Sequence, residues 1–312
     1  MPSSTAPFAP PQTPGIPEAR AALGIPETTR GIVLWGSSSM ASEGGGEGAP
    51  VPVRLHELLA AAAAPLPVIL HGERGGILST HTLLQRGLAA PTVHPLLPAA
   101  QAIGRAPVGL DPVLPPRGAL DMPGMLGRIP GHLRCTAPTG WEFVADDPRA
   151  ALAPAVFRSS LGAAAEGMRQ VLWMGKNNIE QVDQVLADVQ AMWDAARDPA
   201  EDSLVLGQWP TPLDPRGSAT EAALSAVNAE QARRYGRRFL DLRSLLATAE
   251  GLASVPVLAP LRLQDDPAVA ADLQRGHVPH RLVARDERHL NAWGNLAVGW
   301  ALVRRMKELR WL

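Results

Sequence analysis

The chain of 312 residues contains a single cysteine, Cys135, and a single tyrosine. One cysteine excludes an intramolecular disulfide framework and any cysteine-rich metal site, so Cys135 is expected to be a buried free thiol. Aromatic residues make up 4% of the chain, and the formal net charge is −1. A chain with almost no net charge gives no electrostatic reason to bind nucleic acid or an anionic membrane, and neither is expected as a partner.

Long apolar runs are also missing. No run approaches the roughly 20 residues that a membrane-spanning helix needs. Residues 1–17 are rich in proline, serine, threonine and alanine, without the basic and then apolar pattern of a secretory signal. The sequence therefore predicts neither a signal peptide nor a transmembrane segment. It leaves open the oligomeric state and the location, which is either cytoplasmic or reached by another route of export or virion assembly.

Short apolar runs alternate with amphipathic helical patterns over most of the chain. Strands are expected at 32–35, 67–70, 170–174, 203–206 and 238–242, and helices at 53–64, 79–87, 179–196, 220–235 and 289–309. This alternation predicts βαβ units. We expect residues 1–29 to be an extended tail and residues 30–312 to form an α/β domain. Its expected fold is a flavodoxin-like three-layer α/β/α sandwich with a five-stranded parallel sheet.

Residues 88–160 interrupt this pattern. The segment is dense in proline and glycine, lacks helical periodicity and contains short apolar runs at 92–94, 108–110 and 141–144. A structureless loop of this length is improbable inside a compact domain. The segment is therefore predicted to be a small β-rich inserted subdomain or cap.

Residues that carry chemistry follow the predicted strands. The first strand runs into Gly36-Ser37-Ser38, the second into the stretch 71–76 (HGERGG), and the third into the stretch 175–178 (GKNN). Because the carboxyl ends of parallel strands share one edge of a sheet, these loops are expected to meet there. Near the C-terminus, Asp286 stands three residues before His289. A serine needs a base, and the base needs an orienting acid, so the chain offers the components of a nucleophilic triad.

These blocks resemble those of the SGNH (GDSL-type) hydrolases. Gly36-Ser37-Ser38 is similar to the family's Gly-Asp-Ser block, which implies that Ser38 is the nucleophile and that Ser37 stands where the family usually has Asp. The stretch 175–178 is similar to Gly-x-Asn-Asp and implies an oxyanion-hole role for the Asn177 amide. Asp286 and His289 match the Asp-x-x-His block. Further likeness lies at 185–189 and 228–242.

The second block matches least well. The family has Asn-x-Gly-x-x-Gly there, with a glycine N–H that donates to the oxyanion. Alignment without gaps places His71, Glu73 and Gly76 at the three defined positions, whereas a shift of one residue places Gly72 at the first glycine. The resemblance thus implies an oxyanion hole of the Ser38 N–H, the N–H of either Gly72 or Glu73, and the Asn177 amide.

The expected function is a serine ester hydrolase. The most similar family members carry a β-rich insertion between the second and third blocks, and this likeness favours carbohydrate O-deacetylation, with a small ester or an acetylated glycan as substrate. Two alternatives stay open. The first is a polysaccharide O-acyltransferase built on the same triad. The second is a catalytically degenerate glycan-binding module of a phage or surface assembly. The serine at position 37, where the family usually has Asp, is consistent with this alternative.

Several other residues have competing interpretations. His71 and His81 are candidates for lining the cleft. Trp35, Trp173 and Trp209 are expected in the core, with stacking on a sugar ring as the alternative. No cofactor and no metal are expected, because no His/Asp/Glu cluster has convincing ligand spacing. The nearest approach is the pair in the stretch 277–280 (HVPH), for which chance is the simpler explanation.

Overall fold

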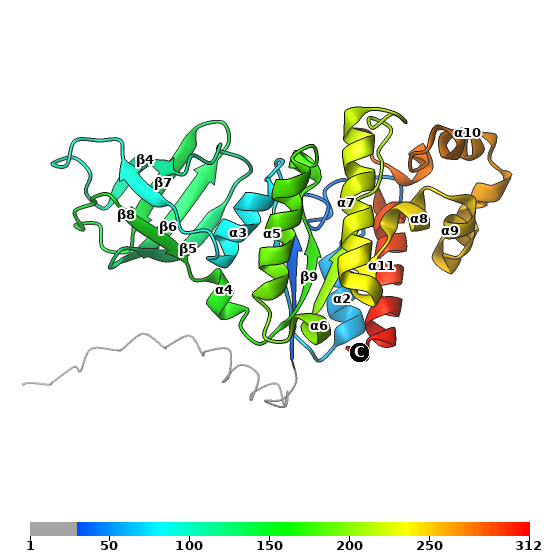
Figure 1. The fold of residues 1–312 in the computed structure, drawn as a ribbon, viewed down its shortest axis with the longest axis horizontal. Helices are drawn as coiled ribbons and strands as arrows, with labels where there is room; N and C mark the ends of the chain where they lie inside the picture. Colours follow the sequence, from blue (N-terminus) through cyan, green and yellow to red (C-terminus); the bar gives the residue numbers. More distant parts are fainter. Residues whose placement is uncertain (1–29) are drawn as a thin grey trace, which may run out of the picture.

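The computed structural model describes residues 30–312, and the predicted tail, residues 1–29, lies outside the described residues. The fold is mixed α/β and contains a parallel sheet together with a closed antiparallel barrel. Figure 1 shows the barrel at one end, the sheet with its helices in the middle and a group of short helices at the other end. No helix among residues 30–312 is both long enough and apolar enough to cross a membrane.

The parallel sheet is built from the five segments that the sequence predicts as strands. These are β1 (Ile32–Gly36), β2 (Val68–Gly72), β9 (Arg169–Trp173), β10 (Ser203–Leu206) and β11 (Phe239–Leu240). Their order is β11-β10-β9-β1-β2, and all neighbouring pairs are parallel. β1 is therefore a central strand, which explains why its side chains are buried without exception.

Helices pack on both faces of this sheet. Along β1, Ile32 and Leu34 join one apolar core and Val33 and Trp35 join another, as alternation along a strand requires. The first core includes α2 (Leu55–Ala63) and α11 (Ala292–Glu308). The second includes α5 (Val182–Asp194) and α7 (Ala219–Tyr235), beside which lies α3 (Ser79–Arg86).

The prediction for the last helix is wrong at its start. The helix was expected from His289, but α11 begins at Ala292, with the Asn291 side chain accepting hydrogen bonds from the N–H groups of Trp293 and Gly294. His289 therefore lies in the preceding loop. Asp286 likewise lies outside α11, five residues before its N-cap.

Short elements complete the described chain. They are the helices α4 (Leu161–Ala164), α6 (Pro199–Asp202), α8 (Leu242–Leu246), α9 (Ala249–Ala253) and α10 (Pro267–Arg275), and the 3-10 turns η1 (Lys176–Asn178), η2 (Gly236–Arg238), η3 (Pro256–Leu261), η4 (Leu263–Asp265) and η5 (His280–Leu282). The sequence interpretation assigned no structure to the region from α8 to α10, where no element exceeds nine residues.

The barrel occupies the segment that was expected to be β-rich. Its strands are β3 (Thr92–Pro95), β4 (Arg105–Asp111), β5 (Asp121–Leu126), β6 (Ile129–Thr136), β7 (Gly140–Ala145) and β8 (Ala155–Ser159), closed in the order β3-β4-β7-β6-β5-β8. The interior holds Phe143, Phe157, Leu133 and Met122. Cys135 is a buried free thiol there, and burial raises its pKa.

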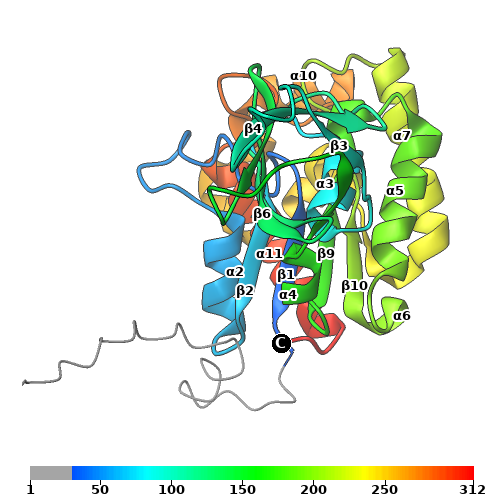
Figure 2. The ribbon, with the colours of Figure 1, turned by 90° about the vertical axis from the view of Figure 1, so that its left-hand side faces the viewer.

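The connection from β4 to β5 joins the barrel to the sheet. The His81 ring on α3 hydrogen-bonds the Pro115 carbonyl at 3.0 Å, and the Trp141 indole donates to the Leu114 carbonyl at 2.9 Å. A Cβ on Gly75, in the loop after β2, would lie 2.7 Å from the Cα of Gly118. Figure 2, which views the molecule from the barrel end, shows the barrel strands in front of the sheet. The barrel thus adjoins the loop that follows β2.

Candidate active site

Ser38 lies just beyond the carboxyl end of β1. A Cβ on Gly36 would lie 2.1 Å from the Trp173 carbonyl oxygen, so only glycine permits the close approach of β1 and β9 at this point. The chain then turns back, with the Ala41 N–H donating to the Ser37 carbonyl at 3.1 Å and the Glu43 N–H to the Ser38 carbonyl at 2.9 Å. This turn holds Ser38, which is 5% exposed, at the strand's carboxyl end.

The same turn presents free backbone donors. Within residues 30–312, the N–H groups of Ser38, Ser39 and Met40 have no hydrogen-bond acceptor. Successive unpaired N–H groups at the start of a helical turn form a concavity that attracts negative charge. The turn that carries the Ser38 hydroxyl can therefore also stabilise an oxyanion next to it.

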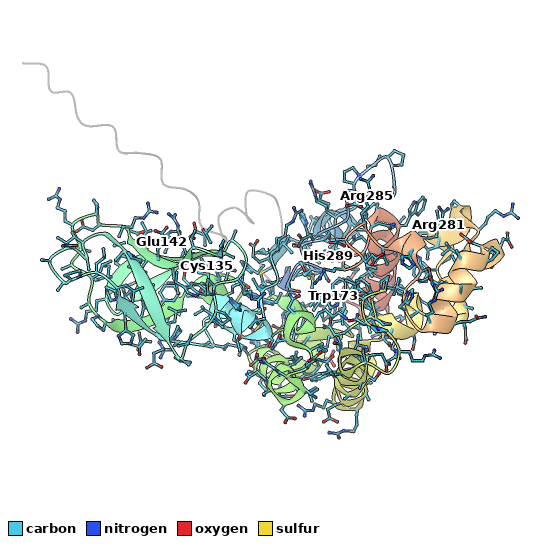
Figure 3. The ribbon with its side chains drawn as sticks, turned by 90° about the horizontal axis from the view of Figure 1, so that it is seen from above. Cys135, Glu142, Trp173, Arg281, Arg285 and His289 are labelled. Atoms are coloured by element: carbon cyan, nitrogen blue, oxygen red, sulfur yellow. The ribbon has the colours of Figure 1, made fainter. Side chains whose placement is uncertain are left out.

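The C-terminal loop brings an imidazole to this serine. The Nε2 atom of His289 lies 2.9 Å from the Ser38 Oγ, and its Nδ1 atom lies 2.5 Å from an Asp286 carboxylate oxygen. Ser38 and His289 are 251 residues apart along the chain. Figure 3 shows His289 in the middle of the molecule, between Cys135 on the barrel side and Arg281 on the helical side. The His289 ring is thus within hydrogen-bond reach of Ser38 on one side and of Asp286 on the other.

Asp286 is held in its ionised form. Burial by itself would raise the pKa of Asp286, but hydrogen bonds from the His289 ring and from the N–H groups of Arg288 and His289 outweigh burial, so the pKa lies below its ordinary value. Because a carboxylate accepts hydrogen bonds only, Nδ1 must carry the proton. The other ring nitrogen, Nε2, is then free to accept the Ser38 proton.

A second carboxylate faces the imidazole. One Glu43 oxygen lies 3.6 Å from the Nε2 atom of His289. Glu43 also lies close to Glu73, whose pKa is raised chiefly by burial and in smaller part by the negative charge of Glu43. A negative charge beside Nε2 favours the positively charged imidazolium that forms when the ring takes a proton. Sequence reasoning missed Glu43, because the residues around it match no recognisable motif.

Residues 44–48 form hydrogen bonds that connect the turn containing Ser38 to the loop containing Asp286 and His289. The Glu47 carbonyl accepts from the Ala292 N–H at 2.8 Å, and the Glu47 carboxylate accepts from the Arg285 N–H at 2.9 Å. The Trp293 indole donates to the Gly48 carbonyl at 3.1 Å. These bonds bracket the Asp286–His289 stretch on both sides. These hydrogen bonds explain how Ser38 and His289, which come from opposite ends of the sequence, are held next to each other.

The structure does not support either implied donor of the second block. The Glu73 N–H already donates to the Gly36 carbonyl at 3.2 Å, as part of the β1/β2 ladder. The alternation of that ladder turns the Gly72 N–H to the opposite side of β2, away from β1. Gly72 instead allows close packing, since a Cβ there would lie 2.8 Å from the Ala41 nitrogen. This geometry therefore does not support the expected donor role of Gly72 or Glu73, whereas the N–H groups of the turn at Ser38 are free.

Asn177 and its neighbour Asn178 occupy different environments. Asn177 is exposed and donates one amide hydrogen to the Ile77 carbonyl at 2.8 Å, which leaves its second amide hydrogen available. Asn178 is buried and exchanges two hydrogen bonds with Ser79, at 2.9 and 3.1 Å. Because β9 neighbours β1, the loop after β9 lies at the same sheet edge as Ser38. Asn177 thus keeps one amide hydrogen free at this edge of the sheet, whereas the side chain of Asn178 is engaged with Ser79.

The three tryptophan candidates and His81 are buried, and His71 is half-buried against Trp35. Trp35, Trp173 and Trp209 are at most 3% exposed, so stacking on a sugar ring is excluded for all three. His81 is completely buried, and burial lowers its pKa to about 4. The His71 ring stacks on Trp35 with centroids 4.4 Å apart, and burial lowers its pKa to about 4 as well.

The comparisons with known proteins add no relative. No family model, no curated protein and no solved structure matches the chain.

Proposed function

We propose that this protein is a serine-dependent carboxylic ester hydrolase with Ser38 as nucleophile, His289 as general base and Asp286 as the orienting acid. The observation that carries the proposal is the distance of 2.9 Å between the Ser38 Oγ and the His289 Nε2, on a ring whose Nδ1 faces Asp286. A serine that merely caps a turn has no need of an oriented imidazole.

The chemistry follows from this arrangement. Nε2 of His289 takes the hydroxyl proton as Oγ of Ser38 forms a bond to the ester carbonyl carbon. The tetrahedral intermediate collapses, the proton passes from Nε2 to the departing alcohol, and the acyl group stays on Ser38. A water molecule then gives its proton to Nε2 and attacks the acyl carbon, which releases the acid and restores the serine. Asp286 stays ionised throughout and stabilises the imidazolium.

The oxyanion is assigned to the donors at the same sheet edge. The N–H groups that follow β1 and the free amide hydrogen of Asn177 are available to it. Removing one such donor typically costs about 3–4 kcal/mol of transition-state stabilisation.

The proposed fold family agrees with this chemistry. In chain order the parallel strands stand 2-1-3-4-5, which is the order of the flavodoxin-like sandwich, whose ligands bind at the strands' carboxyl ends. Together with the motifs around Ser38, Asn177, Asp286 and His289, this order supports our proposal that the chain is an SGNH (GDSL-type) hydrolase.

For the substrate we propose an O-acetylated carbohydrate. Gly118, in the connection between β4 and β5 of the barrel, packs closely against Gly75 in the loop after β2. The barrel therefore stands beside the edge of the sheet at which Ser38 lies. A folded unit in that position is suited to select a bulky alcohol portion of the ester. Acetate release from acetylated xylan or acetylated xylo-oligosaccharides, measured with and without an added sugar acceptor, separates hydrolysis from acetyl transfer.

The decisive experiment compares Ser38→Ala with Ser254→Ala, which removes an exposed hydroxyl at the end of α9. We expect S38A to lose p-nitrophenyl acetate hydrolysis and covalent labelling by a fluorophosphonate, while S254A keeps both. Unchanged hydrolysis in S38A refutes the assignment. A wild-type protein that the fluorophosphonate does not label favours the degenerate glycan-binding module instead.

A further inference from the structure

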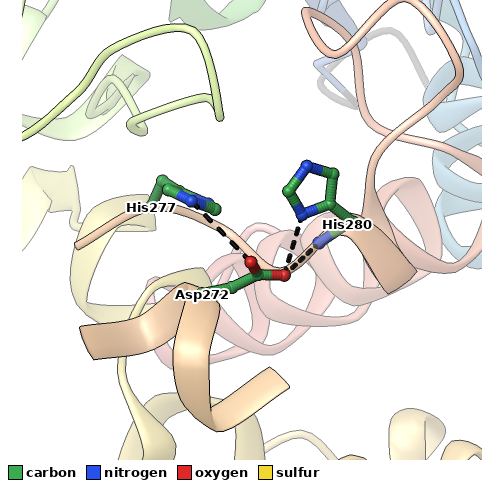
Figure 4. Close-up of side chains that lie close together, drawn as sticks. All are labelled: Asp272, His277 and His280. Atoms are coloured by element: carbon green, nitrogen blue, oxygen red, sulfur yellow. Dashed lines mark hydrogen bonds and ion pairs between the residues drawn. The ribbon is translucent and has the colours of Figure 1, made fainter. Parts of the chain in front are cut away.

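The structure gathers three metal-binding side chains outside the proposed triad. Asp272 lies on α10, and His277 and His280 lie in the segment that follows this helix. One ligand atom from each residue lies within 4.8 Å of the others. Figure 4 shows the two imidazole rings on either side of the Asp272 carboxylate. The pair 277–280, which the sequence interpretation ascribed to chance, is thus joined by a carboxylate.

The contacts of His277 show which of its nitrogens faces the carboxylate. Its Nδ1 lies 3.0 Å from the Val278 carbonyl oxygen. A carbonyl only accepts, so Nδ1 carries the proton and Nε2 carries the lone pair. That Nε2 lies 3.8 Å from an Asp272 oxygen, and both side chains are only 6% exposed. The same Asp272 oxygen lies 3.4 Å from the Nη1 atom of Arg275, and the other oxygen accepts from the His280 N–H at 3.0 Å. A buried lone pair that faces a buried carboxylate is unfavourable, and a cation bound between them removes this repulsion.

His280 completes the arrangement from the solvent side. Its Nδ1 lies 2.9 Å from the second Asp272 oxygen, and its Nε2 lies 3.8 Å from a Glu287 oxygen. A metal-binding histidine ordinarily donates its other ring N–H to a carbonyl or a carboxylate. Val278 supplies that acceptor for His277, and Glu287 is placed to supply it for His280.

The spacing suits a tetrahedral ion. Zinc binds histidine nitrogen and carboxylate oxygen at about 2.0–2.2 Å, which places tetrahedral ligands roughly 3.4 Å apart. The separations from the two oxygens of the Asp272 carboxylate, 2.9 Å from Oδ2 to His280 and 3.8 Å from Oδ1 to His277, lie on either side of this value. We propose that Asp272, His277 and His280 form a binding site for a divalent cation, with zinc as the preferred metal and water in the fourth position.

The position of the site gives it a structural consequence. His280 lines a cavity of about 630 Å³ together with Glu47, Glu287 and Asn291. It also begins η5, whose Arg281 carbonyl accepts from the Asn291 side chain, the N-cap of α11. A metal at this site ties α10 to the segment that supports the loop of Asp286 and His289. The metal acts through the fold and not on the ester.

The test uses the tag-free, full-length chain, freed of metal with a chelator and then dialysed against Zn²⁺. We expect one tightly bound zinc per chain, and a Co²⁺-loaded form with the intense visible absorption of tetrahedral coordination. D272N and H277Q are expected to weaken Zn²⁺ binding by more than about 100-fold, beyond the 10–100-fold loss that follows removal of an outer partner. Zn²⁺ is expected to raise the Tm of the wild type and not of these variants.

The matched control is His132→Gln in the barrel. His132 pairs with Asp121 at 2.5 Å, which is a histidine–carboxylate pair without a second histidine, and H132Q should bind zinc as the wild type does. If the buried variants fail to fold, H280Q answers the question, because the His280 side chain is half exposed. A wild type that retains no zinc, or an H280Q variant with wild-type affinity, overturns the site. Every readout is independent of ester hydrolysis, so this test and the test of the proposed function fail separately.

Discussion

Gly44 and His289 are in direct contact, although 245 positions separate them in the sequence: a Cβ on Gly44 would lie 2.9 Å from the Cβ of His289. Gly44 also has a φ of +85°, which side chains rarely adopt. The position of His289 therefore requires a glycine at position 44. This contact leads to the first of four predictions.

Gly44→Ala should disturb the triad. The added methyl group pushes on His289 and imposes a strained φ that costs about 1–3 kcal/mol. Since a displacement of about 1 Å at a reacting group can cost 100-fold, we expect kcat/KM for p-nitrophenyl acetate to fall at least tenfold. Gly46→Ala is the matched control, because a Cβ there meets nothing within 4 Å. Equal activities in the two variants would contradict the prediction.

Asp286→Asn should lower kcat far more than it lowers stability. The amide no longer fixes Nδ1–H or stabilises the imidazolium, and in a comparable triad this change costs about 10⁴ in kcat. Asp286 is 44% exposed, so we expect only a small change in Tm. The pKa of this carboxyl is lowered in the folded protein, so its stabilising effect is present above the unfolded pKa and is lost as the pH falls through the folded value. Between pH 6 and 8 the D286N and wild-type Tm values should therefore run parallel, while steady-state kinetics separate them.

Asn177→Ala should lower activity, whereas Asn178→Ala should lower stability. N177A removes an exposed donor and is expected to lower kcat by about 10²–10³ with the Tm nearly unchanged. N178A leaves the buried Ser79 N–H without its acceptor, although the Ser79 hydroxyl keeps its hydrogen bond to Asp188, and is expected to cost about 1–3 kcal/mol in the free energy of unfolding. Urea denaturation and kinetics on both variants check this assignment. Reversed effects would show that Asn178 is the donor.

His81 should make the protein less stable in mild acid. Its pKa is about 4 in the fold against an ordinary value of 6.5, so the unfolded chain binds a proton that the folded chain refuses. The stabilising effect of the neutral ring is present above pH 6.5 and decreases as the pH falls toward 4, by roughly 1.4 kcal/mol for each pKa unit at most.

His81→Gln should flatten this dependence. The variant loses buried hydrogen bonds and is expected to be less stable than the wild type at pH 8, but to lose less on acidification. His71, whose pKa is also about 4, should retain its own share of the slope in this variant. The measurement is the free energy of unfolding at several pH values. The same dependence on pH in H81Q and in the wild type would refute this prediction.

Part of the structure was predictable because it is encoded locally. β1 is a continuous apolar run because a central parallel strand is buried on both faces, and such a run is visible in the sequence. The same holds for α5, whose apolar positions recur at helical spacing. The region from α8 to α10 was missed because its elements are too short to show a period.

The candidate site divides in the same way. The sequence by itself determined the residue types and their order: a serine after a strand, an Asn-Asn pair after another strand, and an aspartate three residues before a histidine. Only the tertiary structure decided that Ser38 meets His289, that the Glu73 N–H is used up in the sheet, and that Asp272 joins His277 and His280. The physical reason is that residue pattern reports local backbone preference and burial. Which donor remains free, and which distant groups touch, depends on how the elements pack.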